Sequence, residues 1–233
     1  MVKKIHVCGR EISLYLPAQF DGTAVWCHGA SAAVWDAMGE TNAALLNVEN
    51  VDWNGELSPW AAEKVFRSGD DFRGGADAYL NELVSALIPA AEPELPGAVT
   101  CRCIAGYSLA GLFAVYAAFR CDAFRRIASA SGSMWFDGFA AFAEKTPVCR
   151  LPEKIWFSLG DRESDTRNVR MAAVGRDTQT VAEIFRRRGA QTQFTWNSGG
   201  HFSEPDRRLA DGIRWITSDP ATSISYKNKG DSL

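Results

Sequence analysis

The sequence lacks the charge excess and the long apolar runs that mark two large classes of proteins. Its formal net charge is only −3 and lysine and arginine form no clustered face, since the run Arg186–Arg188 is expected at the solvated end of a helix. Neither nucleic acid nor another polyanion is therefore an expected partner. No apolar run approaches the ~18–20 residues that span a membrane. The first residues, Met1–Val7, are typical of a strand and lack the apolar segment of a secretion signal. These absences predict a cytoplasmic protein without a membrane or nucleic-acid partner.

The cysteines also lack the spacing of a zinc site or of a disulfide framework. One Cys-X-Cys occurs, but the six cysteines include no Cys-X-X-Cys and no second ligand pair. Cys8, Cys27, Cys101 and Cys103 lie within or beside apolar runs, where a free thiol behaves as a small buried hydrophobe. We therefore expect reduced thiols, no metal and no organic cofactor, while the oligomeric state stays open.

The sequence does contain a regular alternation of short apolar runs with longer helical patterns, which is typical of a mostly parallel sheet covered by helices. The expected strands are, in chain order, Lys4–Cys8 and Glu11–Leu16 as a hairpin, then Thr23–Cys27, Leu45–Val51, Val99–Ala105, Arg126–Ala130, Lys154–Leu159 and Gln193–Trp196. The expected helices are Gly75–Ala91, closed by Pro89 and Pro93, then Leu109–Phe119, Val169–Arg188 and Pro205–Ile216. This pattern predicts one α/β domain over residues 1–218 and a flexible, polar tail over residues 219–233.

One strand–turn–helix segment has the residue types of a nucleophile. Gly106–Gly111 follows an apolar strand and opens a helix, so the tight turn pushes Ser108 clear of the sheet at the positive end of the helix dipole. Glycine commonly stands two residues after such a serine, where this chain has Ala110. The simpler alternative is that Ser108 only caps the helix.

A serine nucleophile needs a base that titrates near neutrality, and histidine is the usual one. Of the three histidines, His6 and His28 precede Ser108, whereas His201 lies in a loop between the last expected strand and the last expected helix. The order of nucleophile, acid and histidine along the chain is that of the α/β-hydrolase fold. We therefore predict Ser108 as nucleophile and His201 as general base.

The acid that orients the histidine is expected on a loop after a strand, between the serine and the histidine. The turn Gly160–Asp165 meets this condition and carries three carboxylates. Glu163 is the first choice and Asp161 the second, while Asp165 is the remaining candidate. Position alone does not select one of them.

The developing oxyanion needs two backbone N–H groups. Leu109, directly after the serine, is expected to supply one. The loop that begins at His28 is expected to supply the other, with Ala30 as the named donor and His28 shaping the loop.

Aromatic residues gather near these segments and are candidates for lining a substrate pocket. The candidates are Trp60, Trp135 and Phe202, together with His28. The alternative is that the aromatic side chains only pack in the core or at the rim of the site.

Four segments of the chain resemble one esterase family, which includes esterase D, the feruloyl esterases and the siderophore esterases. They are Ala105–Phe113, Ser131–Trp135, Ser158–Glu163 and Gly199–Phe202, and the similarity extends from about Thr23 to Ile216. The resemblance implies an α/β-hydrolase fold without a large lid domain, a carboxylic ester as small-molecule substrate, and the acid at Glu163.

The expected reaction is ester hydrolysis through an acyl-enzyme on Ser108. Two alternatives remain, namely an acyltransferase on the same fold and a hydrolase-like binding protein whose site is idle. The presence of both Ser108 and His201 argues against an idle site.

Overall fold

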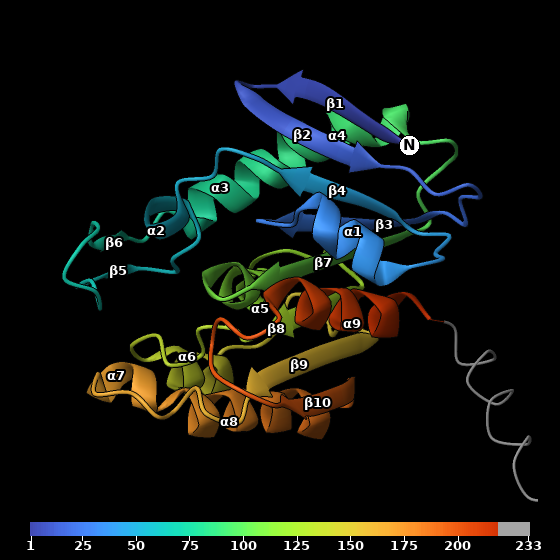
Figure 1. The fold of residues 1–233 in the computed structure, drawn as a ribbon. Helices are drawn as coiled ribbons and strands as arrows, with labels where there is room; N and C mark the ends of the chain where they lie inside the picture. The colour runs from blue at the N-terminus through green and yellow to red at the C-terminus, as the bar shows by residue number, and fades with distance from the viewer. Residues whose placement is uncertain (219–233) are drawn as a thin grey trace, which may run out of the picture.

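The computed structural model describes residues 1–218, and an eight-stranded sheet runs through its centre (Figure 1). The strand order is β1-β2-β4-β3-β7-β8-β9-β10, antiparallel from β1 to β4 and parallel from β4 to β10. The strands of this sheet are β1 (Val2–Val7), β2 (Arg10–Tyr15), β3 (Thr23–His28), β4 (Ala44–Val48), β7 (Cys101–Tyr107), β8 (Arg126–Ala130), β9 (Lys154–Gly160) and β10 (Gln191–Asn197). The mostly parallel sheet of the α/β-hydrolase fold is thus confirmed, whereas the predicted tail, residues 219–233, lies outside the described residues.

Helices cover both faces of the sheet (Figure 1). They are α1 (Ala32–Met38), α2 (Trp53–Glu56), α3 (Ala76–Glu82), α4 (Ile88–Ala91), α5 (Leu109–Arg120), α6 (Phe139–Lys145), α7 (Val169–Ala172), α8 (Val174–Arg187) and α9 (Pro205–Thr217). Helices α1 and α9 pack side by side on one face, and α3, α5, α6 and α8 pack on the other. A small hairpin of β5 (Ala61–Ala62) and β6 (Phe72–Arg73) stands apart from the main sheet.

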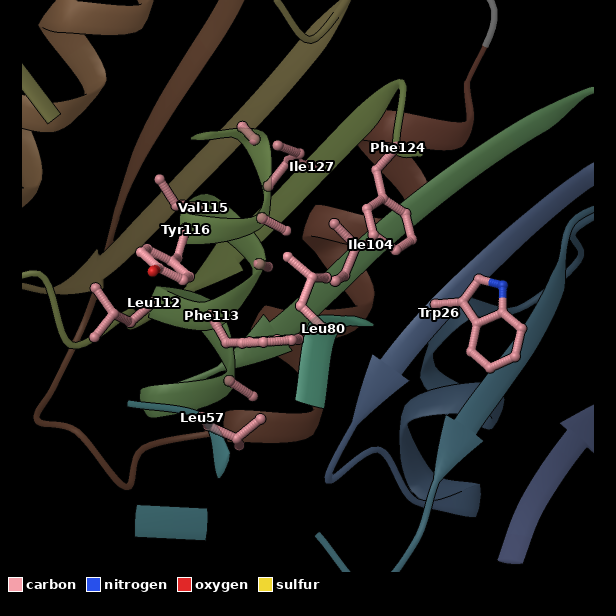
Figure 2. Close-up of a cluster of buried hydrophobic side chains, with 14 of the residues drawn as sticks. Trp26, Leu57, Leu80, Ile104, Leu112, Phe113, Val115, Tyr116, Phe124 and Ile127 are labelled. Carbon is pink, nitrogen blue, oxygen red and sulfur yellow. The ribbon is translucent and has the colours of Figure 1, made fainter. Parts of the chain in front are cut away.

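The core is centred on β3, β7 and α5. All six residues of β3 are buried, as expected for a strand covered on both faces. Helix α5 is buried from Leu109 to Phe119, because it lies between the sheet and the outer helices. This burial on every side explains why its residues are apolar all round the helix. Figure 2 shows Phe113 and Tyr116 of this helix in the same buried cluster as Ile104 of β7.

Two helices differ from the prediction. The segment expected as one helix, Gly75–Ala91, contains five π-helical residues, Leu83–Leu87, between α3 and α4. Pro89 does not end it, because this proline occupies the first turn of α4, where a missing N–H is tolerated. The segment expected at Val169–Arg188 divides at Ala173 into α7 and α8.

The cysteine prediction is correct in part. All six thiols are free, and Cys27, Cys101 and Cys103 are buried. Cys8 is exposed, contrary to the prediction, because it occupies the tight turn between β1 and β2 with a φ of 51°. Within residues 1–218, no helix has the length and apolar character to cross a membrane.

Candidate active site

Ser108 stands on a strained turn between β7 and α5. Its φ of 58° and ψ of −123° are unfavourable for a residue with a side chain, so the surroundings must hold it there. The N–H of Ser108 donates to the carbonyl of Ala130 (3.0 Å), and the N–H of Ser133 donates to the carbonyl of Ser108 (3.0 Å). At Gly106 a Cβ would lie 2.3 Å from the backbone of Ala110, so only glycine fits beneath the turn.

The structure brings Ser108, His201 and Glu163 into one hydrogen-bonded line. His201 Nε2 lies 3.0 Å from Ser108 Oγ, and His201 Nδ1 lies 2.7 Å from Glu163 Oε2. The three residues follow β7, β10 and β9, parallel strands whose carboxyl ends meet at one edge of the sheet. This arrangement permits the serine proton to pass to Nε2 while the carboxylate holds the Nδ1 proton.

Glu163 is buried and well supplied with donors. Its side chain is 2% exposed. Oε1 accepts hydrogen bonds from Ser131 Oγ (2.7 Å) and from the N–H of Gly160 (2.7 Å), which leaves Oε2 for His201. Burial alone would raise the pKa of this carboxyl, but the hydrogen bonds from His201, Gly160 and Ser131 outweigh burial and lower it. Glu163 is therefore ionised at neutral pH.

Arg208, from the buried face of α9, lies behind the carboxylate. Its side chain is 3% exposed, and Nη1 lies 3.1 Å from Glu163 Oε1 and 3.2 Å from Ser131 Oγ. Nη2 donates to the carbonyl of Ser198, at the start of the loop that carries His201 (2.9 Å). One guanidinium thus joins the acid, the serine after β8 and the histidine loop.

Of the three carboxylates in the predicted turn, only Glu163 contacts the histidine. Asp161 Oδ1 accepts the N–H of Gly199 (2.8 Å), so this residue supports the loop before His201. Asp165 is exposed, and its N–H donates to the carbonyl of Arg162 (3.1 Å). The alternative acid Asp161 therefore has a structural partner of its own.

The backbone of His201 is tied to the nucleophile turn by Tyr107. The Tyr107 hydroxyl donates to the carbonyl of His201. Because Tyr107 immediately precedes Ser108, the same turn fixes both the nucleophile and the histidine loop.

The predicted oxyanion donors have different environments. Leu109 is the first residue of α5, a position whose N–H has no partner within the helix. The N–H of Ala30 donates to buried Asn47 Oδ1 (2.8 Å), so Ala30 is not an available donor and that prediction is wrong. Gly29, with a φ of 73°, comes between Ala30 and the end of β3, where His28 is in register with Gly106.

Two pockets meet at Ser108. The Leu109-side pocket is bounded by Trp53, Asn54, Lys64, Phe72 and Leu109, and the His201-side pocket by Met171, Val174, His201 and Phe202. Ser133, Phe66 and Trp135 line both. The predicted pocket residues Trp135 and Phe202 therefore do line the site.

The other two predicted pocket residues lie elsewhere. His28 is fully buried, its Nε2 lies 2.7 Å from the Tyr79 hydroxyl, and its ring packs edge-on against Phe113. Burial lowers the pKa of His28 to about 3, so the ring is neutral and structural. Trp60 donates its indole N–H to the carbonyl of Asp137 (3.0 Å), packs against three phenylalanine rings and lines neither pocket.

Several residues of the candidate site were not predicted from the sequence. Phe66 is a lone aromatic side chain in a polar loop and is 58% exposed, which is a weak signal of a binding role. Arg208 lies one turn before Gly212 and two turns before Ile216, on the buried face of α9. A charged residue at an apolar position of a helix pattern indicates a buried ion pair and could have been noticed in the sequence. Met171 and Val174 carry no such signal. Within residues 1–218, no group of three or more ligand-type side chains could hold a metal ion.

Comparisons with known proteins agree with this fold. The family model Esterase, described as "Putative esterase", matches residues 13–205. The uncharacterised protein YbbA of Bacillus subtilis (strain 168) is 24% identical over 148 residues, which span 62% of this chain and 59% of that protein.

Solved structures extend the likeness over nearly the whole chain. Siderophore hydrolase EstA from Aspergillus nidulans has a TM-score of 0.72 at 17% identity, with 93% of each chain covered. An IroE-like serine hydrolase from Shewanella oneidensis has a TM-score of 0.75 at 15% identity, with 93% of this chain and 80% of that chain covered. These likenesses show the fold, and the family model covers most of the sequence, so the chain belongs to the Esterase family of the α/β-hydrolase superfamily.

Proposed function

We propose that the protein is a serine esterase that cleaves carboxylic esters through an acyl-enzyme intermediate. The observation that carries the proposal is the line from Ser108 Oγ through His201 to buried Glu163, with distances of 3.0 and 2.7 Å. A serine hydroxyl is a weak nucleophile by itself, and an adjacent oriented imidazole is what activates it.

The reaction has two balanced halves. Ser108 Oγ attacks the ester carbonyl carbon while its proton passes to His201 Nε2, and the imidazolium then gives that proton to the departing alcohol oxygen as the carbon–oxygen bond breaks. In the second half, water loses a proton to Nε2, attacks the acyl-enzyme, and the proton returns to Ser108 as the acid leaves. Glu163 remains ionised throughout and stabilises the imidazolium.

The oxyanion of each tetrahedral intermediate would bind two backbone N–H groups. We assign the first to Leu109 and move the second from Ala30 to Gly29, because the Ala30 N–H already donates to Asn47. Gly29 directly follows His28, which is in register with Gly106 of β7, two residues before Ser108. A Cβ at Gly29 would lie 3.0 Å from the ring of Trp53, which lines the Leu109-side pocket. This crowding supports placing the Gly29 backbone at the pocket wall.

A fluorophosphonate probe tests the nucleophile, and hydrolysis of short-chain p-nitrophenyl esters tests the reaction. We expect labelling that maps to Ser108 and is lost, together with turnover, in Ser108→Ala. Asp165→Asn is the matched control, because Asp165 is exposed and does not contact His201. The ester screen includes siderophore esters, because two similar structures are siderophore hydrolases. The proposal would be refuted if folded wild-type protein neither reacts with the probe nor cleaves any of these esters. Added alcohol acceptors in the same assay distinguish hydrolysis from acyl transfer.

A further inference from the structure

The proposed reaction fixes which half of an ester enters each pocket. The departing oxygen must take its proton from His201 Nε2, so the alcohol half has to lie on the side of the histidine. The oxyanion must point toward the N–H of Leu109, and the acyl half then lies in the pocket beyond that residue. The His201-side pocket is therefore the alcohol site of the proposed esterase.

The lining of the His201-side pocket is apolar. Its side chains apart from the triad and two serines are Phe66, Trp135, Met171, Val174 and Phe202. Among the described residues, the only charged side chains in the lining are Glu163 and, when it is protonated, His201, and these are paired with each other. Ser131 Oγ is likewise engaged with Glu163. A charged alcohol would lose water here without gaining a partner.

The Leu109-side pocket has a different character. Asn54, Lys64 and Ser68 contribute to its wall beside the aromatic side chains. The two halves of the substrate therefore meet different surroundings, polar and aromatic on the acyl side and apolar on the alcohol side.

Two features of the pocket wall indicate an apolar occupant. Phe202 is 85% exposed and lies edge-to-face on the His201 ring, with the ring centroids 5.1 Å apart, and Phe66 is 58% exposed. Large apolar side chains exposed together at the mouth of a catalytic pocket are accounted for when a substrate covers them.

The wall is also tied together from distant parts of the chain. Asn168, which caps α7, donates to the carbonyl of Val65 (3.1 Å), and Arg170 donates to the carbonyl of Glu63 (2.6 Å). These bonds hold the loop that carries Phe66 against the helix that carries Met171. The pocket is thus formed before substrate arrives, which reduces the entropy lost on binding.

We propose that the His201-side pocket selects esters of uncharged, apolar alcohols, such as alkyl or benzyl alcohols, over esters of charged alcohols. The selection rests on the proposed esterase function and is exerted by Met171, Val174 and Phe202. The acyl half does not enter this pocket and contributes nothing to the preference.

Two acetate esters of nearly equal intrinsic reactivity test the selection. They are benzyl acetate and the acetate ester of 4-(hydroxymethyl)benzoate, which share the acyl group and differ by a carboxylate remote from the reacting bond. We expect kcat/KM of the wild type to favour benzyl acetate at least tenfold, because the charged ring finds no partner in the pocket. Met171→Lys should reduce or reverse this ratio, since the ammonium would face the carboxylate.

Controls separate the pocket from general charge effects. Val169→Lys adds the same charge at an 85% exposed position on the same helix, outside the His201-side pocket, and should leave the ratio within about twofold of the wild type. Phe202→Lys places the same charge at a second residue of the His201-side pocket and should change the ratio in the same direction as Met171→Lys. Phe202 is exposed and is not part of the core, and any effect of the substitution on His201 cancels in the ratio of the two esters.

A wild-type ratio near one, or an equal change in Met171→Lys and Val169→Lys, would overturn the alcohol-site proposal while the esterase function stands. Turnover of p-nitrophenyl acetate distinguishes the two cases. If folded wild type fails to cleave that activated ester as well, the proposed function and the alcohol site fail together.

Discussion

Replacing Arg208 by methionine tests how the acid of the proposed triad is held. The substitution keeps an unbranched chain of similar volume but removes the cation that lies 3.1 Å from Glu163 Oε1. It also removes the donors to Ser131 and to the carbonyl of Ser198. Both partners of the ion pair are buried, with side chains 3% and 2% exposed, so solvent does not compensate for the loss.

The magnitude follows from what remains around Glu163. Removing one partner of a buried ion pair costs ~3–5 kcal/mol of unfolding free energy. Glu163 keeps hydrogen bonds from Ser131, Gly160 and His201, so the lower end, about 3 kcal/mol, is expected. Arg207→Met is the matched control, because Arg207 is 68% exposed and, among residues 1–218, pairs with exposed Glu204 alone. The loss of Arg207 should cost less than about 1 kcal/mol of unfolding free energy.

The pH dependence of the unfolding free energy lost in Arg208→Met identifies the cause of that loss. The pKa of Glu163 is lowered in the folded protein, so its charge stabilises the fold above the unfolded pKa of about 4.3, and this stabilisation is lost as pH falls through the lower folded pKa. Arg208 faces Glu163 from α9, while His201 and Tyr107 face it from the other elements of the site. Without Arg208 the folded pKa rises, so the deficit of the variant should be largest above about pH 5 and should narrow toward pH 4.

Urea unfolding of both variants between pH 7 and pH 4, with a double-mutant cycle to Glu163→Gln, measures these quantities. This account of Arg208 would be refuted if Arg208→Met lowers the unfolding free energy by less than about 1 kcal/mol, or by an amount that does not change with pH. Because Arg208 does not line either pocket, the same variant should lower kcat and leave KM nearly unchanged.

Three further outcomes follow from other contacts. Glu163→Gln should lower kcat by roughly 10²–10⁴-fold, whereas Asp161→Asn, whose amide oxygen can still accept the Gly199 N–H, should lower it less than about tenfold; steady-state kinetics with one ester compares them. The pKa of buried His28 is lowered to about 3, so below about pH 6.5 the unfolded state binds a proton that the folded state does not. The unfolding free energy should therefore fall by up to ~1.4 kcal/mol for each pH unit of acidification, and it should fall less steeply in His28→Gln. Gly212→Ala should cost about 1–3 kcal/mol in denaturant titration, because a Cβ there would lie 2.5 Å from the ring of buried Trp156.

The sequence predicted the sheet well because its strands are short apolar runs bounded by turns. The predicted bounds of the strand Arg126–Ala130 agree with those of β8, and the other expected strands of the sheet correspond to observed strands whose ends are shifted by a few residues. Helices α1 and α6 were missed, since each is only seven residues long and carries too few periods for a pattern. The π-helical segment Leu83–Leu87 was also missed, because it satisfies the same apolar periodicity as an α-helix within one turn.

The site was harder to predict wherever a role depends on a distant partner. The order of residues selected Ser108 and His201, but it could not choose among the carboxylates of the turn after β9. That choice depends on Gly199 engaging Asp161 and on Arg208 engaging Glu163, two contacts between segments 38 and 45 residues apart. Ala30 was mispredicted for the same reason, since Asn47 on the neighbouring strand accepts its N–H.

The contacts that hold the candidate triad and those that shape the pockets belong to different parts of the molecule. Glu163, His201 and Ser108 are fixed by strand ends, by Tyr107 and by Arg208, all of which are tied to the sheet or to α9. One side of the His201-side pocket comes instead from the loop around Phe66 and from α7 and the start of α8, and hydrogen bonds of Asn168 and Arg170 hold that loop and α7 together. Substitutions in the second group can therefore change which ester is accepted without moving the atoms that would break it. This separation is why the alcohol preference is best read from a ratio of two substrates, in which a change in the chemistry common to both cancels.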